Sequence, residues 1–446
     1  MIRKLERVLT VLIVVLTGYL FYGMYQPQIH KLTAELRKSV RQTEAKEEFQ
    51  QEEDPAEDLP PVYDCRENGK APAVKNQGNL GTCWALAATS ALEANLRPGE
   101  IWNFSADHMS MQNGYEKNQN DGGAYTMAMA YLASWTGPVR EEDDVYGDGY
   151  SPEGLSAVKH VQEMHMIKDG SLEEIKEEIY RWGAVQASVY VDDQRSLENS
   201  VYYSQLNNSY CYVGNEPANH DILIIGWNDF YSAANFTYNV SEDGAFICQN
   251  SWGNHFGEDG IFYVSYEDVR IRECCVSYAQ IEDADNYGTI YQTDRCGWVG
   301  QLGYDLPECY FANVYTPEGD ERLEAVGFYA TDRDTSYEIY VAEQFTDTSS
   351  LVLWESAVSG SFELAGYYTV KLPEPVQLTA GQPFAVIVKI TTPGSKYPVA
   401  AEYRADENTK NVVIEDGEGY ISQGGYVWSR TEEGYGCNVC LKVYTS

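Results

Sequence analysis

The stretch VKNQGNLGTCWALAA, residues 74–88, passes from a glycine-rich loop into a segment rich in alanine and leucine. This pattern predicts a helix that starts at Cys83, continues to Leu96 and is ended by the Arg-Pro-Gly of residues 97–99. Cys83 then occupies a helix N-terminus, where unpaired backbone N–H groups favour a thiolate over a thiol. A thiolate attacks acyl carbon, so Cys83 is a candidate nucleophile; a buried structural cysteine is the alternative.

A nucleophilic thiolate needs a base that takes up its proton and later protonates the leaving amine. Among six histidines, His220 stands out because it opens the apolar run 222–227, which predicts a strand able to hold the ring rigidly at a cleft. The base also needs an orienting group. Asn250 supplies an amide for this, and Trp252 an indole that shields the pair from water.

Three blocks of this chain, at 77–84, 219–227 and 250–263, resemble the papain family of cysteine peptidases, and the chain order Gln, Cys, His, Asn agrees. The resemblance implies a role for each matching residue: Cys83 as nucleophile, His220 as general base and acid, Asn250 as its orienting partner, and Gln77 as a side-chain donor to the oxyanion. It also implies six substrate-binding positions, which are Gly122, Gly123, Tyr125, Ala187, Ala218 and Trp252.

The glycine pair would let an extended peptide backbone approach closely, although a plain turn before a helix at 124–135 explains it as well. Tyr125, Ala187 and Ala218 would line the pocket for the second residue before the scissile bond, which implies an apolar preference there. One departure from the family is Leu80, which replaces a cysteine that most members engage in a disulfide.

The charge balance restricts the partners. The chain has 446 residues, with 31 Lys and Arg against 68 Asp and Glu, a formal net charge of −37. Nucleic-acid binding usually requires clustered basic residues, so DNA and RNA are not expected as partners. The length predicts two or three domains.

The N-terminus predicts export. Three basic residues within the first seven precede an apolar run at 8–25, which is just long enough to span a membrane and has no clear cleavage site. We therefore expect residues 1–25 to be a membrane anchor, with a cleaved signal peptide as the alternative. Residues 26–61 are expected to form an acidic stem or a short pro-segment. The rest would lie at the extracellular face of the membrane, or be secreted if the signal is cleaved.

The ten cysteines suit an exported protein with some disulfides, whose pairing the spacing does not reveal. Cys437 and Cys440 alone are weak evidence for a metal, because a tetrahedral site needs a second pair. No metal or cofactor is expected.

Two folded domains are expected. Residues 62–285 would form an α+β papain-like peptidase of two lobes, helical from about 83 to 182 and strand-rich after it, with the active site between them. Ser171 and Glu174 form a capping-box pattern that predicts a helix ended by Gly183, followed by a strand at 184–191. His160 and His165 fall in a polar segment that predicts a solvated helix.

Residues 286–446 alternate short apolar runs with turn residues, which predicts an all-β sandwich. The expected strands are 323–330, 337–342, 367–372, 383–390, 426–428 and 439–444. The tandem arrangement is similar to exported bacterial papain-like proteins with a lectin-like C-terminal domain. Four rings are candidates for stacking on sugars, with core packing as the alternative: Trp298, Tyr310, Trp354 and Trp428.

The leading functional hypothesis is a cell-surface or secreted cysteine peptidase that acts on peptides or proteins. The alternatives are a papain-fold acyl transferase, which would use the same residues, and a catalytically idle adhesin. The β-domain is expected to bind a glycan or position the enzyme, and to take no part in bond cleavage.

Overall fold

The computed structural model describes residues 59–192, 197, 199–414 and 417–446. Residues Pro60–Ser446 form one compact unit. The expected anchor at 1–25, and the stem at 26–61 apart from its last three residues, lie outside the described residues. Within the described part, no helix is long and apolar enough to cross a membrane.

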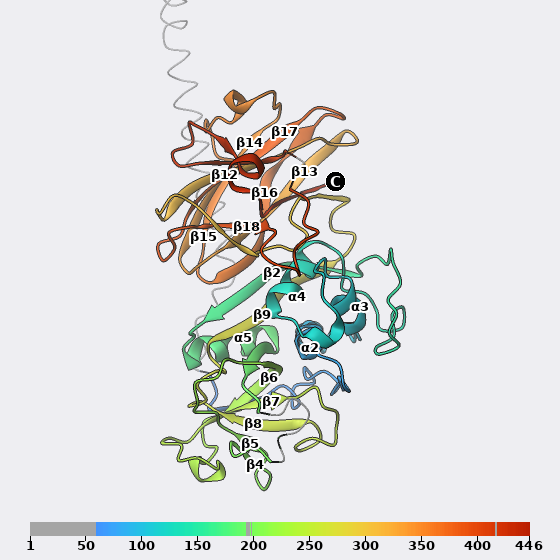
Figure 1. Ribbon diagram of the computed structural model, residues 1–446, viewed down its shortest axis with the longest axis vertical. Coiled ribbons are helices and arrows are strands. Elements are labelled where there is room, and N and C mark those ends of the chain that lie inside the picture. Colours follow the sequence, from blue (N-terminus) through green and yellow to red (C-terminus); the bar gives the residue numbers. More distant parts are fainter. Residues whose placement is uncertain (1–58, 193–196, 198, 415–416) are drawn as a thin grey trace, which may run out of the picture. The chain divides into compact units, whose positions relative to one another are not determined.

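Helices α2 to α5 lie in the first half of this unit (Figure 1). Helix α2 (Cys83–Leu96) has the predicted bounds, and its side chains from Trp84 to Ala94 are buried. Helix α5 (Leu172–Trp182) begins at the predicted capping box, in which Ser171 and Glu174 exchange hydrogen bonds, and it ends at Gly183 with φ 94°. The other helical segments are α3 (Ala106–Met111), η1 (Gln119–Asp121), α4 (Tyr125–Ala133), η2 (Ala233–Asn235), η3 (Thr348–Ser350) and α6 (Thr431–Tyr435).

A 13-stranded sheet runs through both halves in the order β10-β22-β13-β16-β2-β9-β3-β6-β7-β8-β5-β4, with β1 paired to β6. The strands of its first half are β1 (Val62–Asp64), β2 (Lys159–Lys168), β3 (Val185–Val189), β4 (Tyr203–Ser204), β5 (Ser209–Tyr210), β6 (His220–Asn228), β7 (Ala245–Gln249), β8 (Ile261–Ser265) and β9 (Cys274–Asp283). Helices α2 and α5 both contact β3, β6 and β9. They cover opposite faces of the sheet. Tyr278 of β9 contacts Gln186, which bonds to Trp84 of α2, whereas Ser277, which points to the other side, contacts Glu178 of α5.

The second half is a β-sandwich, as the sequence predicts. Its six-stranded sheet, in the order β15-β14-β17-β12-β19-β20, packs on β13, β16 and β22 around an apolar core that includes Phe311, Phe328 and Val388. A third sheet has the order β11-β18-β21. The strands are β10 (Thr289–Tyr291), β11 (Gly300–Leu302), β12 (Glu308–Tyr315), β13 (Glu321–Ala330), β14 (Thr335–Ala342), β15 (Val358–Phe362), β16 (Ala365–Leu378), β17 (Phe384–Thr391), β18 (Val399–Tyr403), β19 (Gly419–Ser422), β20 (Ser429–Arg430), β21 (Cys437–Val439) and β22 (Leu441–Thr445).

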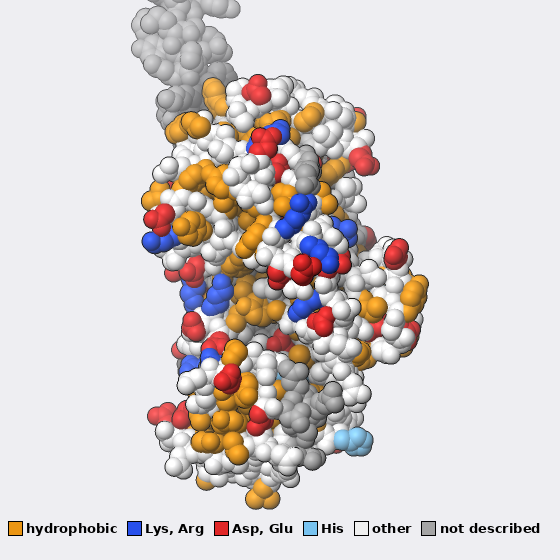
Figure 2. Space-filling model, in the orientation of Figure 1, with side chains coloured by type: hydrophobic (Ala, Val, Ile, Leu, Met, Phe, Trp, Pro, Cys, Tyr) orange, Lys and Arg blue, Asp and Glu red, His pale blue; other side chains and the backbone are white. Residues whose placement is uncertain are grey.

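The prediction of a strand at 426–428 is wrong. Tyr426 and Val427 are almost fully exposed between β19 and β20, and only Trp428 packs against an apolar cluster. On the face shown in Figure 2, hydrophobic side chains alternate with small groups of acidic and basic ones.

The helix expected around His160 and His165 is also wrong, because both residues are buried on strand β2. Strand β2 pairs with β16, and this pairing joins the two halves into one sheet (Figure 1). A chain ending near residue 285 would therefore lose the partner of β2 and expose an unpaired edge.

His165 makes the junction sensitive to pH. Its Nδ1 lies 3.0 Å from Glu178 and its Nε2 3.3 Å from Glu163, while its ring stacks on Tyr368 of β16. Burial opposes the charged form, but the two carboxylates raise the pKa of His165 to about 9.

Because this pKa lies above the unfolded value of about 6.5, the contribution to stability is complete below pH 6.5 and lost as the pH rises through 9. We expect a loss of up to about 3 kcal/mol in the free energy of unfolding over this range. Urea titrations at pH 6 and 9.5 would measure it, with His165→Gln as the comparison. An equal pH dependence in the variant would contradict this assignment.

The expectation of disulfides is wrong for this structure, in which all ten cysteines are free thiols. Eight are buried and behave as small apolar side chains. Cys274 and Cys275 are neighbours on strand β9, so their side chains point to opposite faces of the sheet.

Candidate active site

The nucleophile candidate lies where the sequence predicts it. Cys83 is the first residue of α2, and the side chain of Thr82 does not cap the helix but contacts the hydroxyl of Tyr146. The backbone N–H groups of the first turn therefore remain available near the sulfur.

Opposite electrostatic effects act on the Cys83 thiol. Burial is the largest and, together with the Asp221 carboxylate, raises its pKa to about 12; backbone N–H groups, including that of Asp221, oppose this. Burial lowers the pKa of His220 to about 4. Both directions favour an uncharged pair of Cys83 and His220, whereas the helix position alone predicts a resting thiolate.

The base candidate is held by its predicted partner. His220, at the start of β6, is buried, and its Nε2 lies 2.8 Å from Oδ1 of Asn250. An amide oxygen only accepts hydrogen bonds, so Nε2 carries the proton and Nδ1 keeps the lone pair that a base needs. The indole of Trp252 lies 4.9 Å from the imidazole, and Phe256 packs edge-on against that indole.

Gln77 is tied to the same group through Ser251, a residue that sequence reasoning missed. The Ser251 hydroxyl donates to Oε1 of Gln77 (2.7 Å), and the Gln77 backbone N–H donates to the Ser251 carbonyl (2.8 Å). Nε2 of Gln77 donates to Leu80 (2.8 Å), which leaves its second N–H for another acceptor. The Ser251 backbone N–H also donates to Asn250 Oδ1 (2.8 Å).

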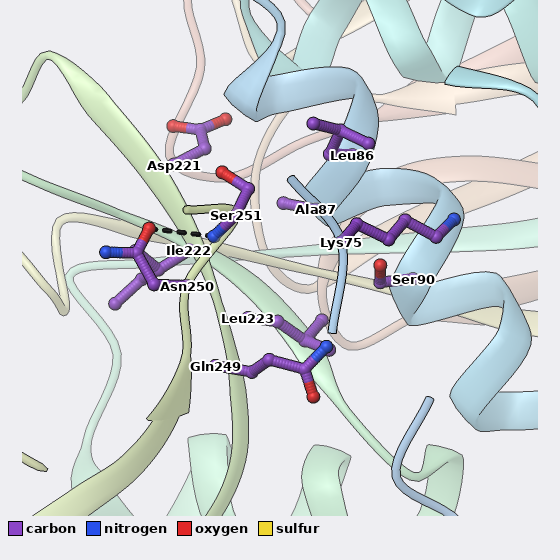
Figure 3. A pocket seen from close by; sticks show the side chains of 10 residues that line it. All are labelled: Lys75, Leu86, Ala87, Ser90, Asp221, Ile222, Leu223, Gln249, Asn250 and Ser251. Atoms are coloured by element: carbon purple, nitrogen blue, oxygen red, sulfur yellow. Dashed lines mark hydrogen bonds between the residues drawn. The ribbon is translucent and has the colours of Figure 1, made fainter. Parts of the chain in front are cut away.

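A small cavity separates α2 from the strands behind these residues (Figure 3). Figure 3 shows Ala87 and Ser90 of α2 facing Leu223 of β6 and Asn250. The cavity has a volume of about 10 Å³, which leaves room for one water molecule at most. This cavity is therefore not a substrate pocket.

The glycine pair lies against the start of α2. A Cβ added to Gly123 would fall 2.2 Å from the indole nitrogen of Trp84, and one added to Gly81 would fall 2.9 Å from the Gly122 nitrogen. Side chains at these positions would push the loop away from the nucleophile.

The structure does not bring the three expected pocket residues together. Tyr125 contacts the Cys274 thiol, on the face of the sheet that carries α2. Ala187 is buried beside Cys275 on the opposite face, which α5 covers. Ala218 is half-buried in the loop before His220. The Cys274 thiol and the Asp221 carboxylate lie near Tyr125, and the carboxylate speaks against a purely apolar pocket.

Two family models match the chain. Residues 59–282 match the model described as papain family cysteine protease, and residues 290–445 match the model described as lectin like domain.

Among curated proteins, cathepsin S from Bos taurus is 30% identical over 222 residues, which are 46% of this chain and 60% of the relative. A probable cysteine protease from Arabidopsis thaliana is 26% identical over 226 residues, 47% of this chain and 59% of the relative. The chain thus spans about 60% of the length of these relatives.

Solved structures share the fold over both halves. The cysteine protease and lectin-like domains of Cwp84, described as a surface layer associated protein of Clostridium difficile, match with a TM-score of 0.73 and 22% identity, over 87% of this chain and 89% of that chain. A Cwp84 variant after propeptide cleavage matches with a TM-score of 0.75 and 22% identity, over 86% and 99%.

Proposed function

The chain belongs to the papain family of cysteine proteases through its residues 59–282, and we propose that it hydrolyses peptide bonds by thiol attack from Cys83. The observation that carries this proposal is the bond between His220 Nε2 and Asn250 Oδ1 (2.8 Å), which leaves Nδ1 free as a base. The Asp221 N–H at the Cys83 sulfur supports it further, because Asp221 directly follows the base.

In the proposed reaction, the Cys83 sulfur bonds to the carbonyl carbon of the peptide while its proton passes to Nδ1 of His220. The carbonyl oxygen becomes an oxyanion, which accepts from the backbone N–H of Cys83 and the free amide N–H of Gln77. The C–N bond then breaks, His220 protonates the leaving amine, and a thioester remains. Water deprotonated by His220 attacks the thioester, which releases the acid and restores the thiol.

The test is to incubate residues 59–446 with an unbiased peptide library, with and without a free amine acceptor, and to identify products by mass spectrometry. New termini without amine adducts support the peptidase. Amine adducts as the main product would favour the acyl transferase, and no Cys83-dependent product would contradict catalysis.

We also propose export, because the apolar run at 8–25 follows basic residues and because the similar protein Cwp84 is described as surface layer associated. Protease shaving of intact cells should remove the peptidase. Its survival under shaving, together with its presence in lysates, would contradict this placement.

For the β-domain we propose carbohydrate binding, because two large rings are exposed on touching segments. Trp354 is 89% exposed and Tyr426 is 90% exposed. The residues beside these rings, Leu353 and Gly425, lie against each other, because a Cβ added to Gly425 would fall 2.4 Å from Leu353. Exposed rings with a polar edge suit the apolar faces of sugars.

The other predicted rings are less available. Trp298 packs against Tyr329 and lies under the Lys168 ammonium at 4.5 Å. Tyr310 is buried, and Trp428 packs against the cluster around Tyr420. Sequence reasoning did not name Tyr426 as a sugar-binding ring, because residues 426–428 were predicted to form a strand.

Replacing both Trp354 and Tyr426 with alanine is expected to weaken binding to polysaccharide extracted from the surface of the producing cells about 10-fold or more, since each stacked ring contributes about 1 kcal/mol. Pull-down against serial dilutions of the polysaccharide would measure this. Tyr150→Ala, which removes an exposed ring of the peptidase half, is the control. Unchanged binding in the double variant would exclude these rings, and no binding by the parent chain would exclude the function.

A further inference from the structure

Asp221 is a buried carboxylate beside the nucleophile that the proposed reaction does not use. It is only 8% exposed, and no ion pair among the described residues includes it. Its Oδ1 accepts from the Ser188 hydroxyl (2.6 Å) and its Oδ2 from the Gln186 amide (2.6 Å). A buried carboxylate without a cation is costly, so its presence needs an explanation.

Gln186 connects this carboxylate to the helix that carries the nucleophile. Its Nε2 donates to Asp221 and also to the backbone carbonyl of Trp84 (3.2 Å), the residue that follows Cys83. Its Oε1 accepts from the Tyr278 hydroxyl (2.7 Å). One amide therefore links strands β3, β6 and β9 to the first turn of α2.

Among the described residues, no cationic side chain forms an ion pair with Asp221; Lys75, which lines the same cavity, pairs with Glu93 instead. The titratable side chains that interact with it are Cys83 on α2, Tyr125 on α4, and Cys274 and Tyr278 on β9; its chain neighbour on β6 is His220. Burial raises the pKa of Asp221, and the donors Ser188 and Gln186 oppose the shift. When Asp221 is ionised, its charge opposes the formation of a second anion at Cys83.

We propose that Gln186 and Asp221 are positioning residues: Gln186 fixes the start of α2 against β6, and the Asp221 carboxylate sets the pH at which Cys83 becomes reactive. This rests on the proposed role of Cys83 as nucleophile. The carboxylate destabilises the fold as the pH rises, because the folded state holds its proton more tightly than the unfolded state. The buried carboxylate thus lowers the stability of the fold while it shifts the pH at which the Cys83 thiol reacts.

The test measures alkylation of Cys83 by iodoacetamide against pH, mapped by mass spectrometry, in residues 59–446. Asp221→Asn is expected to move the midpoint down by about one pH unit or more, because the opposing charge is gone. The same variant should melt at a higher temperature at pH 7. Ser188→Ala, which removes one donor to the carboxylate, should move the midpoint in the same direction by less.

Gln186→Leu is expected to lower kcat for peptide hydrolysis about 10-fold or more with KM little changed, because the nucleophile is displaced. The control is Glu178→Gln. Glu178 lies on α5, which covers the opposite face of the same sheet, and its carboxylate contacts His165 and Ser277. Loss of that ion pair should lower the melting temperature without moving the alkylation midpoint.

An unchanged midpoint in a folded Asp221→Asn protein would overturn the role of the carboxylate, and an unchanged kcat in Gln186→Leu would overturn the role of the amide. The alkylation readout needs no substrate. A shifted midpoint in a protein that cleaves no library peptide would therefore refute the proposed function and leave the action of Asp221 on Cys83 in place.

Discussion

Replacing Cys83 with alanine is expected to reduce kcat/KM for peptide hydrolysis on the order of 10⁴-fold or more, because the thioester of the proposed reaction forms on the Cys83 sulfur. The melting temperature should change little, since Cys83 is only partly buried and an alanine fits the first position of α2. Initial rates on a peptide selected from the library would give the ratio.

The matched control is Cys211→Ala, which removes another free thiol from the same half of the chain. Cys211 is buried against Phe236 and Ala245, away from the residues assigned to the reaction. This variant should lose some stability and keep its activity. Equal activity of Cys83→Ala and the parent chain would contradict the nucleophile assignment.

The second large effect is expected at Gln77. Its replacement with alanine should lower kcat about 10²–10³-fold and leave KM nearly unchanged, because the amide N–H binds the oxyanion only after attack. Steady-state kinetics separates the two constants.

Part of the effect would be structural, because Gln77 also accepts from Ser251. Gln162→Ala serves as the comparison, since Gln162 is an equally buried glutamine on β2 with no role in the reaction. A similar fall in kcat for both variants, or a rise in KM alone for Gln77→Ala, would count against an oxyanion role.

Local signals predicted the helices that position the site. The capping box at Ser171 and the Gly-rich entry to α2 are short-range patterns, and the structure has both helices at the predicted bounds. The pairing of His220 with Asn250 was predicted from the amide of Asn250 and from the resemblance to the papain family. In the structure His220 starts β6 and Asn250 directly follows β7, the neighbouring strand.

Strand β2 was missed because its periodicity is ambiguous. It is buried along nearly all its length, so polar residues such as His160 and His165 do not alternate with apolar ones. Their partners are Asn286 for His160 and Glu178 for His165. Only the tertiary pairing of β2 with β9 and β16 explains such a strand.

The network of Asp221 and Gln186 depends on strand register, which the sequence does not reveal. Ser188 lies opposite Asp221 in the pairing of β3 with β6, and Gln186 lies two residues away on the same face. The same alternation sends Ala187 to the other face. A shift of one residue would exchange the two sets of side chains.

The central claim is that one thiol among ten is made reactive by its place beside His220. Mapping of the thioether formed with a peptidyl chloromethyl ketone under native conditions tests it most directly, since denatured protein offers all ten free cysteines. We expect a single adduct on Cys83, formed much more slowly in His220→Ala. An adduct on another cysteine, or no adduct on Cys83 while denatured protein is labelled at all ten, would contradict the assignment.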